Sequence, residues 1–154
     1  MKLKITIFIL FLIAFSITAI SVSDKQLPIV FGGKELNSPS DWISEKQIKV
    51  YPNKIILDIQ GASWAGFTDT NSMDPFIDKD SNVLQIKPSS AELIQVGDVI
   101  SYKFENRIII HRVILVSEDE TGRYYIVKGD NNELQDPIKV RFNDITGVVV
   151  AVIY

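Results

Sequence analysis

Short runs of β-branched and aromatic residues, separated by turn residues, make up most of the chain after residue 45. Runs of this length and spacing are typical of antiparallel strands joined by hairpins. Capping residues and an early proline within 38–45 predict a short helix or turn there, and Pro52-Asn53 predicts the first hairpin. No long helical period follows residue 50. We therefore expect strands at 47–51, 54–59, around Trp64, and at 83–86, 99–104, 107–116, 124–128 and 145–153.

Some of these runs are apolar on both faces instead of alternating with a period of two. Ile108-Ile109-Ile110 and Val148-Val149-Val150 are examples. Such strands are typically covered on both sides, which favours a closed or strongly coiled sheet. The sequence therefore predicts a mainly β domain with a barrel-like core, and the roughly 130 residues after the N-terminal segment suit one domain.

The first 22 residues carry a membrane signal. Lys2 and Lys4 precede an uncharged, mostly apolar run from residue 5 to residue 22, and its roughly 18 residues would make a helix of about 27 Å. The positive flank predicts a cytoplasmic N-terminus in a single-pass protein of the cell membrane, with an extracytoplasmic domain. Small residues at Ala19 and Ser21 leave open the cleavage of this segment as a signal peptide. In either case the domain is exported.

Three parts are expected: the membrane anchor or signal segment 1–22, a polar linker 23–37, and the β-rich domain 38–154. The chain has 16 Lys and Arg against 19 Asp and Glu, which disfavours a nucleic-acid partner. One histidine and no cysteine exclude disulfides, thiolate catalysis, and zinc sites that need Cys or several His. Asp78-Lys79-Asp80 begins like a calcium loop, but the sixth position is Val83 and the twelfth is Ser89. We therefore expect no metal and no cofactor.

Ser72 lies in the polar stretch 68–75, which Pro75 ends. A turn serine usually hydrogen-bonds its own backbone. It becomes a nucleophile only where a base takes its proton and donors receive the oxyanion. The rest of the chain must therefore supply these groups.

His111 lies within the apolar run 107–116, where a period of two places it on the face of Ile109 and Val113, opposite Arg112. A core histidine with both nitrogens satisfied is one interpretation. A general base for Ser72 is the other. Further along, Asp130 and Asp136 follow a strand within a turn-rich stretch. Either could orient a histidine as the third member of a Ser-His-Asp arrangement, and spacing does not decide between them.

Four ordered segments resemble the boxes of type I signal peptidases, most closely the archaeal and endoplasmic-reticulum branch, in which His replaces the Lys base of the bacterial branch. The resemblance covers roughly residues 64 to 154. It implies a signal-peptidase-like coiled β-sheet or barrel domain after an N-terminal transmembrane helix. The segments are Asn71-Ser72-Met73-Asp74-Pro75, Gly97-Asp98-Val99-Ile100, Ile110-His111-Arg112-Val113, and Lys128-Gly129-Asp130-Asn131-Asn132 with Asp136-Pro137.

The resemblance implies a role for each matching residue. Ser72 would be the nucleophile and His111 the general base. Asp136 is favoured as the partner that orients His111, with Asp130 as a second, structural carboxylate. The Ser72 amide and the Thr70 hydroxyl would form the oxyanion hole. The chain departs from the family at Asn71, where relatives often have Gly or a small residue, and at Asp74, where Glu is common.

The implied function is a membrane-anchored serine endopeptidase that cleaves signal peptides, or similar leader segments, from exported precursors after small residues. Its partners would be these precursor polypeptides and the lipid bilayer, and the need for accessory subunits stays open. The alternative is a catalytically inactive, membrane-tethered extracytoplasmic β module that binds partners. Four aromatic residues could form either a membrane-facing rim or part of the core: Trp42, Trp64, Phe67 and Phe76.

Overall fold

The computed structural model describes residues 35–66 and 68–154. The predicted membrane segment 1–22 and most of the predicted linker lie outside these residues. Within the two described ranges, no helix has the length and apolar character needed to cross a bilayer. Residues from Glu35 to Tyr154 form one compact unit.

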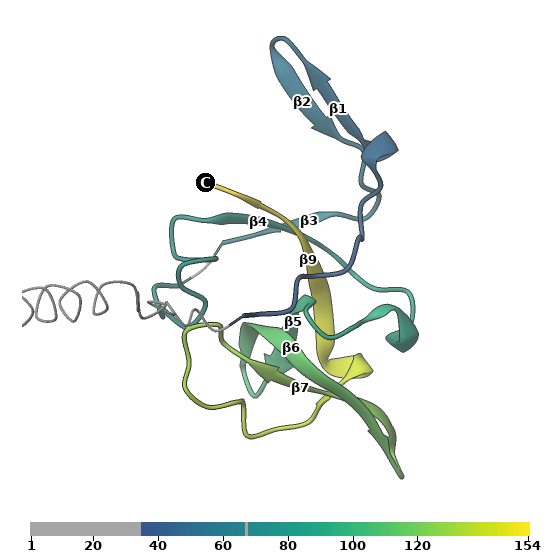
Figure 1. Ribbon diagram of the computed structural model, residues 1–154, viewed down its shortest axis with the longest axis vertical. Helices are drawn as coiled ribbons and strands as arrows, with labels where there is room; N and C mark the ends of the chain where they lie inside the picture. The colour runs from purple at the N-terminus through teal and green to yellow at the C-terminus, as the bar shows by residue number, and fades with distance from the viewer. Residues whose placement is uncertain (1–34, 67) are drawn as a thin grey trace, which may run out of the picture. The chain divides into compact units, whose positions relative to one another are not determined.

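The described part of the chain is mainly β, as predicted, and its strands pair antiparallel (Figure 1). Two strands form a separate hairpin, and seven form one sheet in the order β3-β4-β9-β5-β6-β7-β8. The described residues also contain three single-turn 3-10 helices: η1 (Glu45–Gln47), just before β1, and η2 (Ala91–Leu93) and η3 (Phe142–Asp144), which lie between strands of the large sheet. The strands are β1 (Ile48–Tyr51), β2 (Lys54–Leu57), β3 (Ser63–Ala65), β4 (Asn82–Ile86), β5 (Val99–Phe104), β6 (Arg107–Asp119), β7 (Gly122–Lys128), β8 (Val140–Arg141) and β9 (Ile145–Ile153).

Each predicted strand corresponds to an observed one, and the differences are local. Strand β6 continues to Asp119, beyond the predicted end at residue 116, because β7 pairs with it as far as Gly122. Gly122 has a φ of +101° at the turn, where a side chain would be strained. Strand β8 was not predicted, since two residues are too few to show a period.

A two-residue turn at Glu105-Asn106 sets the register of β5 against β6. Phe104 pairs with Arg107, and the ladder continues until Ile100 pairs with His111 and Val99 with Arg112. Because a strand alternates its faces, neighbouring residues of β5 and β6 point to opposite sides of the sheet. Glu105 has a φ of +53°, which such a tight turn requires.

Two hydrophobic clusters lie against the sheet, and β5 and β9 contribute to both. Ile100 and Val148 belong to the first cluster, whereas Val99 and Val149 belong to the second. The prediction of strands covered on both sides is therefore confirmed for 148–149. It is wrong at Ile108, which is 63% exposed. Ile108 is the second residue of β6, just after the Glu105-Asn106 turn, and lines a cavity.

The segment before the hairpin is held by the stretch that precedes β5. The Asp98 carboxylate is fully buried and accepts hydrogen bonds from the Ser40 amide at 2.7 Å and the Trp42 indole at 3.0 Å. Gly97 must lack a side chain, because a Cβ there would lie 2.1 Å from the Ser38 carbonyl oxygen. Trp42 is thus packed against the first cluster, which contradicts a membrane-facing role for it.

Candidate active site

Ser72 lies on a turn that begins with an unusual backbone conformation. Asn71 has a φ of +55°, a left-handed value that glycine adopts freely and that asparagine tolerates better than most residues. Asparagine can therefore occupy this position with less strain than most side chains would meet. The turn continues with amides of Phe76 and Ile77 donating to the Met73 carbonyl at 2.9 and 3.0 Å.

This turn is joined directly to the loop that follows β7. The Asn131 amide donates to the Ser72 carbonyl at 3.0 Å, and the Asn131 side chain donates to the Asn71 carbonyl at 2.9 Å. Below the turn, the buried Met73 sulfur accepts from the Asp130 amide at 3.5 Å. The serine-bearing segment and the aspartate-bearing loop are therefore one packed unit, although they are distant in sequence.

Gly129 permits this close approach. A Cβ at Gly129 would lie 2.5 Å from the Ser72 carbonyl oxygen, a backbone atom, and 2.6 Å from the Asn132 side-chain nitrogen. We expect Gly129→Ala to push the serine turn away and to lower the free energy of unfolding by about 1–3 kcal/mol, the usual cost of overpacking. Denaturant titration and cleavage assays would measure both effects. Gly61→Ala is the control for a glycine without a clash: its φ of +69° strains a side chain, but no atom lies within 4 Å of a Cβ there. It should lose some stability but keep wild-type cleavage, and an equal loss of cleavage in both variants would contradict the prediction.

Ser72 and His111 both line a cavity of about 520 Å³. The Ser72 hydroxyl is 3.2 Å from the Thr70 hydroxyl and hydrogen-bonded to it. Ser72 Oγ makes no hydrogen bond to His111, and the Ser72 amide has no hydrogen-bond partner among residues 35–66 and 68–154. Much of the remaining wall is apolar and includes Ile77, Ile108 and Ile110.

His111 is oriented by Asp136. Its Nδ1 lies 2.9 Å and 2.8 Å from the two carboxylate oxygens, and the side chains are only 8% and 11% exposed. A carboxylate is an acceptor, so Nδ1 carries the proton and donates it. His111 Nε2 makes no hydrogen bond within the described part of the chain. The imidazole thus has the tautomer and the free nitrogen that a general base needs.

Tyr102 is a further member of this arrangement that the sequence did not indicate. It is fully buried on β5, and its hydroxyl donates to the same Asp136 carboxylate. Burial, followed by the hydrogen bond and the charge of Asp136, raises the pKa of Tyr102, so this hydroxyl stays protonated and remains a donor. The register could have suggested the contact, because Tyr102 pairs with Ile109, two residues from His111 on the same face.

The carboxylate of Asp136 stays charged in this pocket. Burial alone would raise the pKa of Asp136, but the hydrogen bonds from His111 and Tyr102 and the charge of His111 outweigh burial and hold that pKa below its usual range. An acid with a depressed folded-state pKa contributes stability above its unfolded pKa, about 3.9, and loses that contribution as the pH falls through the lower folded value.

Tyr102→Phe tests this balance. At neutral pH we expect the variant to be less stable by about 1.5–3 kcal/mol, since the hydroxyl donates to a charged group. The difference from the wild type should shrink as the pH falls from about 3.9, the unfolded value, through the lower folded pKa of Asp136, where its carboxylate takes up a proton. Denaturant titrations across this range would measure it, and Tyr124→Phe, at a partly exposed position of β7, provides the control. A difference that stays constant down to low pH would rule out the charged hydrogen bond as its cause.

Asp130 has a different partner. Both of its oxygens bind the Arg112 guanidinium, at 2.8 Å from Nε and 2.7 Å from Nη2, and both side chains are almost fully buried. Arg112 also donates to the carbonyls of Gly97 and Asn37, at 2.8 and 3.2 Å, and lies over the Phe76 ring. The predicted opposite orientation of His111 and Arg112 is confirmed. Asp130 joins three segments of the chain and does not contact His111.

We expect Asp130→Ala to act on stability. Leaving Arg112 buried without its carboxylate should lower the free energy of unfolding by about 3–5 kcal/mol. Urea titration of the detergent-solubilised chain would measure this loss, and Asp119→Ala, which breaks partly exposed ion pairs with Lys139 and Arg141, should cost less. Full stability with loss of cleavage would instead assign Asp130 to the chemistry.

The other aromatic residues suggested for a membrane-facing rim differ in their exposure. Trp64 is 66% exposed, and its indole donates to Asn82, while Phe76 packs against the second cluster and Phe67 is outside the described residues. The described residues contain no group of three His, Asp or Glu side chains suited to hold a metal ion.

No protein-family model matches the sequence, and no curated protein matches it.

Proposed function

We propose that this protein is a membrane-anchored serine endopeptidase that cleaves signal peptides, or similar leader segments, from exported precursors. One observation carries the proposal. Ser72 and His111, which are distant in sequence, line the same cavity, and Asp136 holds His111 through Nδ1. The ordered motifs of type I signal peptidases support the same assignment, and we infer that the sheet is of their coiled type.

The proposed reaction begins at the hydroxyl of Ser72. This hydroxyl turns from Thr70 towards Nε2 of His111, a contact that often forms only when substrate is bound. His111 removes the proton as Oγ attacks the scissile carbonyl carbon, and Asp136 stabilises the resulting imidazolium. His111 then protonates the leaving amine. Water attacks the acyl-enzyme with the same base, releasing the new carboxyl terminus and restoring Ser72.

The oxyanion would be received by two donors at the serine turn. The Ser72 amide has no partner in the described part of the chain, and the Thr70 hydroxyl already lies 3.2 Å from Ser72 Oγ. Once Ser72 Oγ leaves this hydrogen bond, Thr70 can donate to the developing charge. A single such donor typically contributes about 3–4 kcal/mol to transition-state stabilisation.

The apolar cavity suits the substrate. Its isoleucine side chains, together with Ala65 and Gly66 in the lining, would accept an extended apolar segment with small residues next to the cut. Catalysis at the outer face of the membrane follows from the charge pattern of residues 1–22, which places the N-terminus in the cytoplasm and the domain outside.

Cleavage of a precursor by the full-length chain in detergent tests the proposal. We expect one cut after a small residue at the end of the signal peptide, identified by mass spectrometry of both products. A precursor with a large charged residue at that position is the control and should stay intact. Absence of cleavage in detergent and in lipid vesicles would contradict the proposal.

One observation favours a second candidate, the catalytically inactive β module that binds partners. Ser72 Oγ is hydrogen-bonded to Thr70 and not to His111. Mass spectrometry of the chain after incubation with a precursor peptide distinguishes the two. An acyl adduct on Ser72 supports the peptidase, whereas binding of the peptide with neither adduct nor cleavage supports the module.

A further inference from the structure

The hairpin of β1 and β2 has one continuous apolar face. In its register Ile48 pairs with Leu57 and Val50 with Ile55. These two pairs are two positions apart along each strand, so all four side chains point to the same side. The alternate pairs put Lys49 with Ile56 and Tyr51 with Lys54 on the reverse side.

This face is uncovered. The hairpin belongs to neither edge of the seven-stranded sheet and projects from it (Figure 1). Val50 is 74% exposed and Ile55 67% exposed. A two-stranded hairpin is at best marginally stable in water on its own, and burying its apolar face would remove a large unfavourable contact with solvent.

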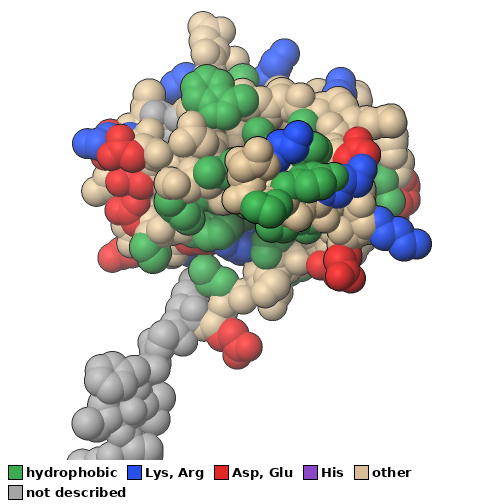
Figure 2. Space-filling model, turned by 90° about the horizontal axis from the view of Figure 1, so that it is seen from above, with side chains coloured by type: hydrophobic (Ala, Val, Ile, Leu, Met, Phe, Trp, Pro, Cys, Tyr) green, Lys and Arg blue, Asp and Glu red, His purple; other side chains and the backbone are tan. Residues whose placement is uncertain are grey.

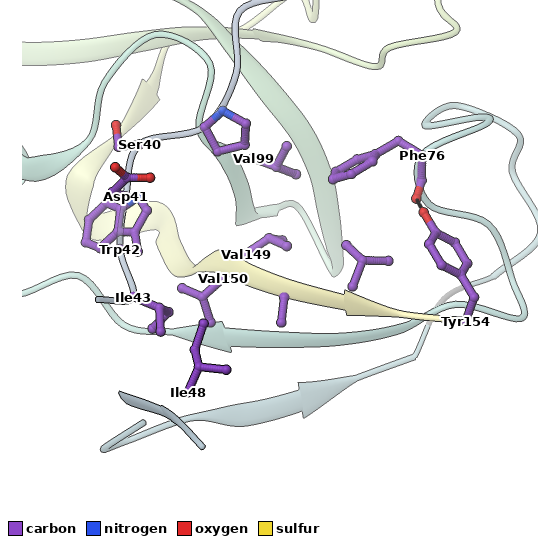
Figure 3. Close-up of a pocket in the computed structure, with 13 residues that line it drawn as sticks. Ser40, Asp41, Trp42, Ile43, Ile48, Phe76, Val99, Val149, Val150 and Tyr154 are labelled. Atoms are coloured by element: carbon purple, nitrogen blue, oxygen red, sulfur yellow. Dashed lines mark hydrogen bonds between the residues drawn. The ribbon is translucent and has the colours of Figure 1, made fainter. Parts of the chain in front are cut away.

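The apolar face continues into a groove of the main body. Ile48 lines this groove together with Ile43 and Val150 (Figure 3), and its volume is about 420 Å³. The end of the domain from which the hairpin projects shows hydrophobic side chains with basic and acidic side chains around them (Figure 2). With the groove, the apolar surface extends beyond the hairpin itself.

The reverse side of the hairpin carries basic and aromatic groups. Lys54 lies over the Tyr51 ring, 5.5 Å from its centroid, and Lys49 is half exposed and lies 3.7 Å from the Asp58 carboxylate. Lysine side chains can extend to the headgroup region while their stems contact apolar surface, and tyrosine is enriched at that level.

We propose that the hairpin docks its apolar face into the lipid bilayer surface. The proposal rests on the membrane anchor of the proposed function. Residues 23–35 between the predicted anchor and the described domain can span at most about 45 Å when extended, so the domain stays close to the bilayer. Amphipathic helices that lie on a membrane bury their apolar face by about 5–10 Å, and the hairpin would use its apolar face in the same way. Docking would hold the domain against the surface from which a signal peptide emerges.

The absence of cysteine allows a direct test with the full-length chain. Val50→Cys and Ile55→Cys, each labelled with an environment-sensitive fluorophore, would be reconstituted into phosphatidylcholine vesicles containing lipid with a nitroxide on the upper acyl chain. We expect quenching at both positions, weaker quenching for Lys49→Cys on the reverse face, and none for Glu120→Cys, which is exposed beyond β6.

The outcomes separate the hairpin from the anchor and from the chemistry. Retention of the chain on vesicles after an alkaline wash reports the anchor, and precursor cleavage reports the peptidase. Lack of quenching at residues 50 and 55 overturns the docking proposal whatever the other two results. If the unlabelled thiol of the Val50→Cys variant is protected from a water-soluble maleimide in native membranes, but not in pure lipid vesicles, the proposal is overturned in favour of a protein partner.

Discussion

Ser72→Ala is expected to abolish precursor cleavage, with a loss of at least about 10⁴-fold in kcat, because the members of a catalytic triad act as a unit. The substitution removes only a hydroxyl bonded to Thr70. The contacts of the Ser72 carbonyl with Asn131 and of Met73 with the loop remain. The variant should therefore keep its fold and its affinity for the precursor. Single-turnover cleavage and a binding assay on the same preparation would measure both.

Ser89→Ala is the matched control, since Ser89 is an exposed serine outside the cavity. It should cleave at the wild-type rate. A Ser72→Ala chain that still cuts the same bond would exclude Ser72 as the nucleophile. Equal losses in both variants would point to a defect of the preparation.

His111→Ala is expected to cause a loss of similar size, because Ser72 would have no base. In the wild type, activity should fall as the pH is lowered, since a protonated imidazole cannot accept the Ser72 proton. The pKa of Asp136 lies below its usual range, so this carboxylate remains charged at the pH values where the activity falls. His111 is the single histidine of the chain. An imidazole titration in the pH–rate profile can therefore be assigned to it.

A second variant separates the base from the structural role of the ring. His111→Asn places an amide donor near the position of Nδ1 and can keep the hydrogen bond to Asp136, but it supplies no base. We expect it to be as inactive as His111→Ala and more stable, because the buried carboxylate keeps a partner. If His111→Asn retains substantial activity, His111 orients the site without transferring the proton.

The strands were predictable because their signals are local. Alternation and turn residues indicate β5 and β6, and the Glu105-Asn106 turn determines which of their residues face one another. Local signals do not say where along a strand its cover ends. Ile108 and Ile110 lie on the same side of β6, yet Ile108 is exposed and Ile110 is buried.

The roles of the two aspartates show more clearly what the sequence does not predict. Asp130 and Asp136 both follow β7 in a turn-rich loop, and spacing leaves them equivalent. In the structure Asp136 binds His111 and Tyr102, whereas Asp130 binds Arg112. Nothing in the sequence indicates a site role for Tyr102, since a tyrosine in a strand is ordinarily a core residue.

The sequence by itself determined the β character of the domain, the polar turn at Ser72 and the placement of His111 and Arg112 on opposite faces of one strand. These depend on side-chain period and turn chemistry, which act between near neighbours. Only the tertiary structure decided which acid meets the imidazole and that Ser72 shares its cavity. Those contacts depend on how the loop after β7 packs under the serine turn, through Gly129 and Asn131, and packing between distant segments has no local signature.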